Sequence, residues 1–127
     1  MNKLKKYRGS LSVGFYGDCS QLHLFFQILC CAKLAGASSV SIIPGDQSFS
    51  VTCKRGKVIR DIAVNISWHA VRPIISRCKL LSGMKLYVRD VSQRGEFQPP
   101  RSYGLPVCRA VTNPTEDGES LKVIFVR

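Results

Sequence analysis

The residues able to do acid–base chemistry are scattered along this chain of 127 residues. His23 falls inside an apolar run, and His69 follows Trp68 where a turn is expected. The eight Asp and Glu residues show no converging pair, and no nucleophile motif accompanies them. A lone histidine in such a setting is usually structural. We therefore expect no catalytic residue and a chain that is not an enzyme.

The six cysteines lack the spacing of a metal site or of a disulfide framework. They sit among Val, Leu, Ile and Phe without a C-x-x-C motif. The adjacent Cys30 and Cys31 would point about 100° apart on a helix, which disfavours a shared metal ion. The glycines form neither a G-x-x-x-x-G-K nor a G-x-G-x-x-G loop for phosphate. We expect reduced, mostly buried thiols, with no metal and no cofactor.

Basic residues give the strongest chemical signal. Nineteen Lys and Arg stand against eight Asp and Glu, so the formal net charge is +11 and the pI is about 9.8. Nucleic acid is the commonest partner of a small basic domain. No base-reading motif gathers these cations, so we expect contact with phosphates without sequence preference. The helices predicted below carry the best candidates, which we call the helix cations: Lys33, Arg72, Arg77 and Lys79.

The length and composition fit one globular domain over residues 1–127, because 45% of the residues are apolar and 21% are charged. The longest apolar run, Leu22–Ala37, is interrupted by polar residues and falls short of the ~18 apolar residues of a membrane span. Polar and turn-forming residues follow the basic N-terminus where a signal peptide would be apolar. We therefore expect an intracellular protein in a reducing compartment, with no membrane contact.

Periodicity predicts the elements of the first half. Alternating apolar residues predict a strand over Lys6–Phe15, and apolar spacings of three and four predict a helix from Leu22 to Gly36. Three strands separated by short turns follow, over Ser39–Pro44, Ser48–Lys54 and Lys57–Ile66. Such short connections favour antiparallel neighbours.

A second helix is expected between Ser67 and Gly83. Pro73 lies inside it, and a proline there removes a hydrogen bond, so the helix is expected to start or to kink at Pro73. Three more strands are expected over Met84–Val91, Gly104–Thr112 and Ser120–Val126. Loops are expected over Arg94–Arg101 and Asn113–Glu119, and turns at Gly45, Gly56 and Gly95.

The order of these elements is strand, helix, three strands, helix, three strands. It predicts an α+β fold made of two βαβββ units, with two helices packed on antiparallel sheet. The apolar spacing of these elements is clearest in five stretches: Lys33–Ala35, Ser39–Pro44, Gln47–Cys53, Val64–Ile75 and Met84–Val88. In this order the stretches resemble one domain of a eukaryotic-type sliding clamp, the family that includes proliferating cell nuclear antigen and the subunits of the nine-one-one checkpoint clamp. Clamp subunits carry two such domains, whereas this chain has room for one.

The resemblance implies a ring whose helices line a hole for duplex DNA. The helix cations would then meet phosphates loosely, which holds the DNA without reading its bases. A nuclear role in DNA replication, DNA repair or a DNA damage checkpoint is also implied. One domain covers only part of a ring, so we expect pairing through sheet edges with other clamp or complex subunits. The expected edges are Leu121–Val126 and a strand of the middle hairpins.

Two other binding functions remain open. The segment Lys79–Val88 also resembles the lead into a strand of an OB-type barrel that binds single-stranded DNA or RNA. Aromatic platforms beside cations would then be Tyr87 with Arg89, Phe49 with Lys54, and Tyr103 with Arg101. A barrel does not explain the long early helix. The other possibility is a subunit of a ribonucleoprotein assembly, whose basic surface meets its partner only inside the complex.

Overall fold

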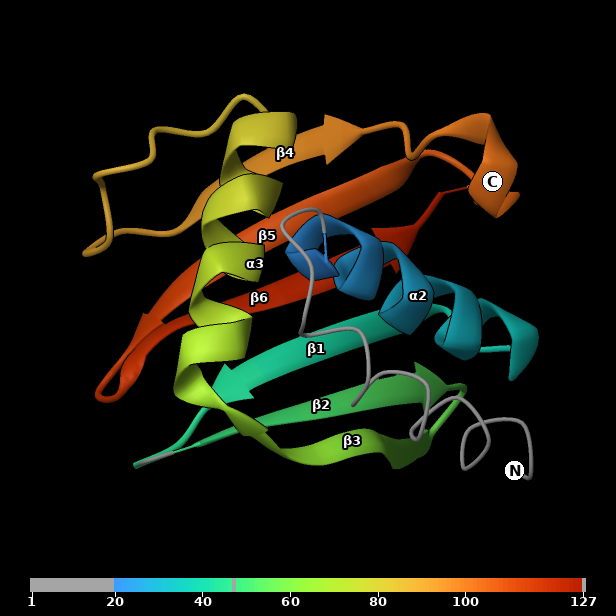
Figure 1. Cartoon of the computed structure of the whole chain (residues 1–127), viewed down its shortest axis with the longest axis horizontal. Coiled ribbons are helices and arrows are strands. Elements are labelled where there is room, and N and C mark those ends of the chain that lie inside the picture. Colours follow the sequence, from blue (N-terminus) through green and yellow to red (C-terminus); the bar gives the residue numbers. More distant parts are fainter. Residues whose placement is uncertain (1–19, 47, 127) are drawn as a thin grey trace.

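Two helices cover one face of a six-stranded sheet in the computed structural model of the chain, which describes residues 20–46 and 48–126 (Figure 1). In chain order the elements are α2 (Ser20–Leu34), β1 (Ser39–Pro44), β2 (Ser48–Arg55), β3 (Val58–Ser67), α3 (Trp68–Leu81), β4 (Gln93–Phe97), the 3-10 helix η2 (Arg101–Tyr103), β5 (Cys108–Thr115) and β6 (Gly118–Phe125). The α+β class and the helices on an antiparallel sheet are confirmed. The strand expected over Lys6–Phe15 lies outside the described residues.

The sheet has the strand order β3-β2-β1-β6-β5-β4, and all neighbouring strands are antiparallel. Each half is a three-stranded meander, and β1 and β6 join the halves, with Val40 opposite Val123. The expected edge over Leu121–Val126 is therefore wrong, because β6 is bonded on both sides. Apolar alternation marks a strand with one buried face, but it is the same in a central strand and at an edge. The described sheet ends at β3 and β4.

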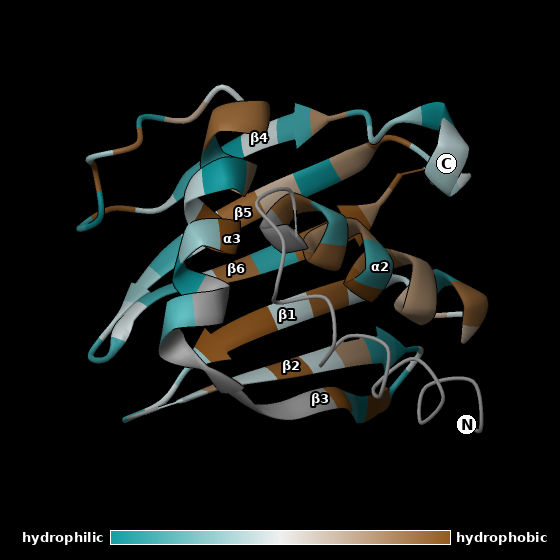
Figure 2. Cartoon of the chain, viewed as in Figure 1, coloured by the Kyte–Doolittle hydropathy of each residue, from teal (hydrophilic) through white to brown (hydrophobic). Residues whose placement is uncertain are grey.

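The core lies between the helices and one face of the sheet. Alternate residues of the strands point toward the helices and are buried, and Figure 2 shows the resulting apolar bands along β1 and β6. The helix α2 is buried around more than half of its circumference because it contacts the sheet, α3 and η2. Phe25 is fully buried there, which is worth about 2 to 3 kcal/mol. None of the described helices is long and apolar enough to cross a membrane.

The strand expected over Met84–Val91 is wrong, because these residues form turns and a loop between α3 and β4. The carbonyl oxygens of Leu86 and Val88 accept hydrogen bonds from the Lys79 side chain rather than from a neighbouring strand. The apolar alternation of this segment therefore reflects packing of a loop. The loop expected over Arg94–Arg101 is wrong in its first half, where β4 forms.

A tight hairpin replaces the loop expected over Asn113–Glu119. The strands β5 and β6 pair up to Thr115 and Gly118, so Glu116 and Asp117 alone form the turn. Pro114 is tolerated near the end of β5, and Gly118 has a φ of +129°, which favours glycine. The hairpin therefore carries two exposed carboxylates to one end of the sheet.

The helix α3 runs through Pro73 and begins at Trp68, so a start at Pro73 is wrong. The helix ends against β4: a Cβ on Gly95 would clash with the backbone oxygen of Ser82. Gly95 is therefore required by this close approach and not by a turn. Gly56 does lie in the turn between β2 and β3 and has a φ of +60°, as the sequence indicated.

Candidate nucleic-acid interface

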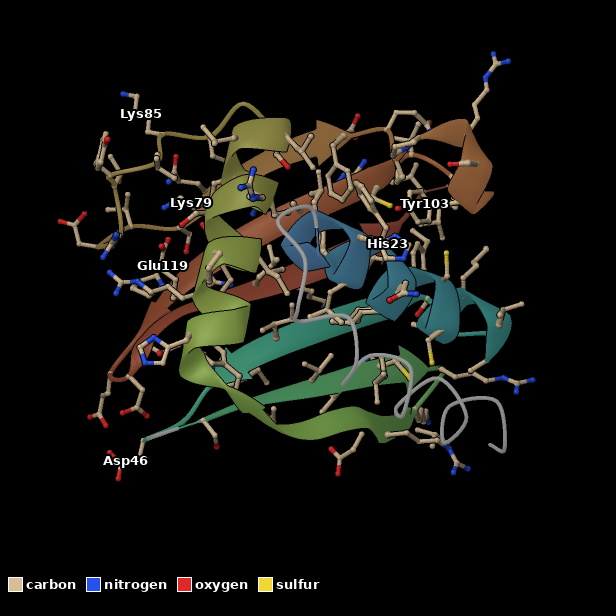
Figure 3. All side chains as sticks on the ribbon, in the orientation of Figure 1. His23, Asp46, Lys79, Lys85, Tyr103 and Glu119 are labelled. Carbon is tan, nitrogen blue, oxygen red and sulfur yellow. The ribbon has the colours of Figure 1, made fainter. Side chains whose placement is uncertain are left out.

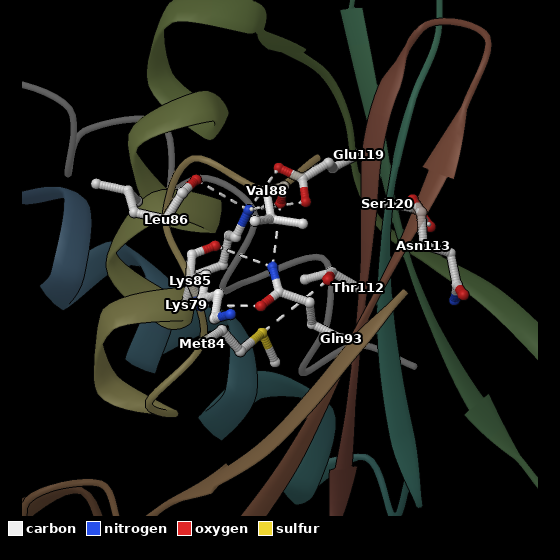
Figure 4. Close-up of polar contacts among 10 residues, drawn as sticks. All are labelled: Lys79, Met84, Lys85, Leu86, Val88, Gln93, Thr112, Asn113, Glu119 and Ser120. Atoms are coloured by element: carbon white, nitrogen blue, oxygen red, sulfur yellow. Dashed lines mark hydrogen bonds and ion pairs between the residues drawn. The ribbon is translucent and has the colours of Figure 1, made fainter. Parts of the chain in front are cut away.

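Lys79 was expected to contact DNA, but among the helix cations it is the one that is fully buried. Its side chain is 1% exposed, and Nζ donates to Leu86 O at 3.1 Å, to Val88 O at 2.8 Å and to the Glu119 carboxylate at 2.9 Å (Figure 4). An ammonium group has three protons, and these three acceptors take all of them. Lys79 therefore has no donor left for a phosphate, which corrects its assignment to a DNA interface.

The other helix cations do not form one cluster. Arg72 and Arg77 are exposed on α3. Lys33 is half-buried in the last turn of α2, where its Nζ lies 5.6 Å from the ring centre of Phe125. This cation–π contact places the charge at the end of the helix and partly shields it. The helix layer thus offers two exposed cations on α3 and one shielded cation on α2.

Among the described residues, the densest positive charge lies on the turn between β2 and β3, which we call the basic hairpin and define by Lys54, Arg55, Lys57 and Arg60. These four cations fall within seven residues, and all four are exposed. None of them forms a salt bridge with any residue in the described ranges. The hairpin is therefore a site of net positive charge at one end of the sheet, where Asp61 is the carboxylate nearest in sequence.

The register distributes the charges of the basic hairpin over both sides of the sheet. Arg60 pairs with Cys53, whose side chain is buried under the helices, whereas Lys54 pairs with Ile59 on the opposite face. The Arg55 side chain runs beside Gly36, just after α2. An anionic strand can therefore meet cations from either side of the hairpin tip. The sequence contains this signal as four cations in seven residues, whereas the resemblance to sliding clamps implies a DNA contact through the helices.

The face of the sheet opposite the helices is polar and partly basic. The register brings Thr52, Ser41, Lys122, Val111 and Arg94 into one row across five strands. On the same face Arg109 and Glu96 form an exposed salt bridge of 3.3 Å. These cations are spread across the sheet, so they form a weaker anion site than the basic hairpin.

Two of the three expected aromatic platforms are used inside the fold. Phe49 is buried. Tyr103 packs on Phe26 with ring centres 4.8 Å apart, and its hydroxyl shares a hydrogen bond of 2.7 Å with His23 Nδ1. Tyr87 is exposed. The described strands do not close into a barrel either, since β3 and β4 lie at opposite ends of the sheet.

The described cysteines are placed as structural thiols. Cys31, Cys53, Cys78 and Cys108 are buried and Cys30 is half-buried, which confirms the expected burial. Burial raises the pKa of Cys31 to about 11 and the pKa values of Cys78 and Cys108 to about 12. Thiols with such pKa values are poor nucleophiles at neutral pH. Over the described ranges, no group of three or more His, Cys, Asp or Glu side chains is arranged to hold a metal ion.

Comparison of the chain with protein-family models found no match, and a search of curated proteins found none.

Proposed function

We propose that this chain is a non-catalytic domain that binds nucleic acid through electrostatic contacts, with duplex DNA as its partner. The observation that carries the proposal is the basic hairpin, whose four cations are exposed and form no salt bridge with a described residue. Such exposed cations bind a phosphate at little cost in free energy, because no internal salt bridge must break. The contact neutralises phosphates and reads no base.

The number of cations sets the strength of the salt dependence. Four phosphate contacts on duplex DNA give a slope of about −3.6 for the logarithm of the binding constant against the logarithm of the salt concentration. Between 50 and 200 mM salt such a slope weakens binding roughly 150-fold. We therefore expect weak, non-specific binding that is visible at low ionic strength.

A relationship to sliding clamps, with a nuclear role in replication or a damage checkpoint, is a further part of the proposal. The order of helix, three strands, helix and three strands supports it. The helix layer supports it less, since Lys79 is buried and Lys33 is shielded. We accordingly place the DNA contact on the hairpin rather than on the helices.

A subunit of a ribonucleoprotein assembly is the second candidate function. The exposed side chains of Val58 and Ile59 lie at the tip of the basic hairpin and favour it. Apolar residues among exposed cations suit a surface that a larger complex covers. In that case RNA, rather than duplex DNA, is the nucleic acid bound.

Fluorescence anisotropy with labelled duplex DNA, single-stranded DNA and RNA at low salt tests the proposal. The variant Lys57→Gln/Arg60→Gln should weaken duplex binding at least tenfold. Arg94→Gln/Lys122→Gln removes the same charge from the open sheet face and should have a smaller effect. If the two variants lost the same duplex affinity, DNA binding would depend on the net charge of the protein and not on the hairpin. A strong preference for RNA would favour the ribonucleoprotein subunit.

A further inference from the structure

The loop between α3 and β4, residues 85–91, is held in place by side chains from both elements, and we call it the anchored loop. Lys79 binds two of its carbonyl oxygens. The Gln93 side chain donates to Lys85 O at 2.9 Å and to Val88 O at 3.1 Å, and it accepts from Lys85 N at 2.8 Å (Figure 4). Five hydrogen bonds thus fix the backbone of a segment that belongs to no strand.

The anchored loop presents its side chains to solvent. Tyr87 is 89% exposed, more than any other large apolar residue described, and Val91 at the end of the loop is also exposed. Figure 3 shows Lys85 pointing away from the fold at the same corner of the molecule. A fixed backbone lowers the entropy cost of binding through such residues. Exposed tyrosine on a rigid loop is typical of a protein interface.

A cavity of about 490 Å³ lies against the anchored loop. Its buried lining includes Phe49 and Ile75, so its deepest part is apolar. Its exposed lining carries both signs of charge: Arg72, Arg89, Asp90, Glu116 and Asp117. The volume is large enough for one aromatic side chain, and the mixed charges suit a partner surface that also carries both signs.

We propose that two copies of this chain pair across a two-fold axis at this corner, with Tyr87 of each copy inserted into the cavity of the other. A two-fold interface needs one self-complementary patch. Here Arg89 and Asp90 of the anchored loop line the cavity together with charges of both signs, and the exposed Tyr87 lies two residues before Arg89. Arg89 of one copy then faces Asp117 of the other, and neither residue has a salt bridge within the described part of its own chain.

Charge complementarity favours a second copy over a nucleic acid at this corner. The carboxylates of Asp90, Glu116 and Asp117 surround the cavity and would repel phosphates. A second copy brings Arg89 and Lys85 to these carboxylates while its own carboxylates meet the same cations. The turns of β2–β3 and β5–β6 lie at opposite ends of the sheet, so this pairing leaves the basic hairpin free (Figure 1).

Sedimentation equilibrium of the full chain from micromolar to millimolar concentration tests the pairing. The wild type should form dimers as concentration rises. Tyr87→Ser should weaken dimerisation roughly 30-fold or more, as expected for a central interface residue. Ile59→Ser removes a side chain that is 66% exposed at the other end of the sheet and should leave the dimer unchanged. A wild type that stays monomeric at millimolar concentration would overturn the proposal.

A charge exchange distinguishes this interface from other modes of pairing. In the two-fold dimer the contact between residues 89 and 117 occurs twice. Arg89→Glu and Asp117→Arg should each be monomeric alone, because each variant puts two like charges together at both contacts. An equimolar mixture of the two variants should form a heterodimer. One contact then has its two charges exchanged, and the other keeps the native Arg89 and Asp117. Failure of the mixture to pair, while both variants remain folded by circular dichroism, would refute the two-fold arrangement. So would a Tyr87→Ser variant that dimerises normally but loses binding to single-stranded DNA.

Discussion

Replacing Lys79 with methionine tests how the buried ion pair holds the second half of the fold. The substitution keeps the length of the side chain but removes its charge and all three donors. Glu119, 10% exposed, is left without its cation, Leu86 O loses its donor, and Val88 O keeps only the hydrogen bond from Gln93. Breaking one side of a buried ion pair costs about 3 to 5 kcal/mol. That is a large part of the 5 to 15 kcal/mol by which a domain is typically stable.

Urea unfolding followed by circular dichroism measures this cost as a change in the midpoint. Arg109→Met is the matched control, because the Arg109–Glu96 pair is half exposed and should contribute less than about 1 kcal/mol. The double variant Lys79→Met/Glu119→Leu should recover part of the loss, since no charge stays buried without a partner. If Lys79→Met cost no more than Arg109→Met, the buried ion pair of Lys79 would not stabilise the second half of the fold.

Four further outcomes follow from the packing. Gly95→Ala should destabilise the protein by more than about 2 kcal/mol in urea, since its Cβ would meet Ser82 O, and wild-type stability would exclude this close approach. Val123→Pro should unfold the chain rather than only separate copies, because β6 is central; a folded monomer by circular dichroism would contradict this. Cys78 and Cys108 should resist a thiol reagent at pH 8 until the protein unfolds. Burial raises the pKa values of these two thiols from 9.0 to about 12, so the thiols of the unfolded chain ionise at lower pH than those of the folded protein. The free energy of unfolding should therefore fall as the pH rises from 9 to 12. A free energy of unfolding that does not change over this range would contradict the burial of the two thiols.

The first half of the described fold, from α2 to β3, could be predicted because its signals are local. The helix α2 follows from apolar residues at spacings of three and four, and β1, β2 and β3 follow from alternation between short turns. Gly56 supplies the positive φ that its turn requires. None of these features depends on a distant residue, so the sequence and the structure agree within a few residues at each boundary.

The second half could not be predicted because distant contacts decide it. Residues 84–91 alternate like a strand, yet their carbonyl oxygens bind a lysine from the preceding helix. Gly95 resembles a turn glycine, but the end of α3 packs on it. The position of β6 in the sheet likewise depends on its pairing with β1, some eighty residues earlier, which no local pattern contains.

The positive charge of the candidate site could be predicted from the sequence, but its position in the fold could not. The net charge of +11 indicated an anionic partner, and the run around Gly56 contained the basic hairpin. Lys79 was misplaced because its partner Glu119 lies forty residues away in sequence. Its position four residues after the buried Ile75 was the available signal that it faces inward.

The slope of duplex DNA binding against salt concentration tests the central claim most directly. The wild type should give a slope of about −3.6, and Lys57→Gln/Arg60→Gln should reduce it to about −1.8, because each lost contact removes about 0.9. A slope near zero, or a slope that the hairpin variant leaves unchanged, would contradict the assignment of the basic hairpin as the contact with DNA.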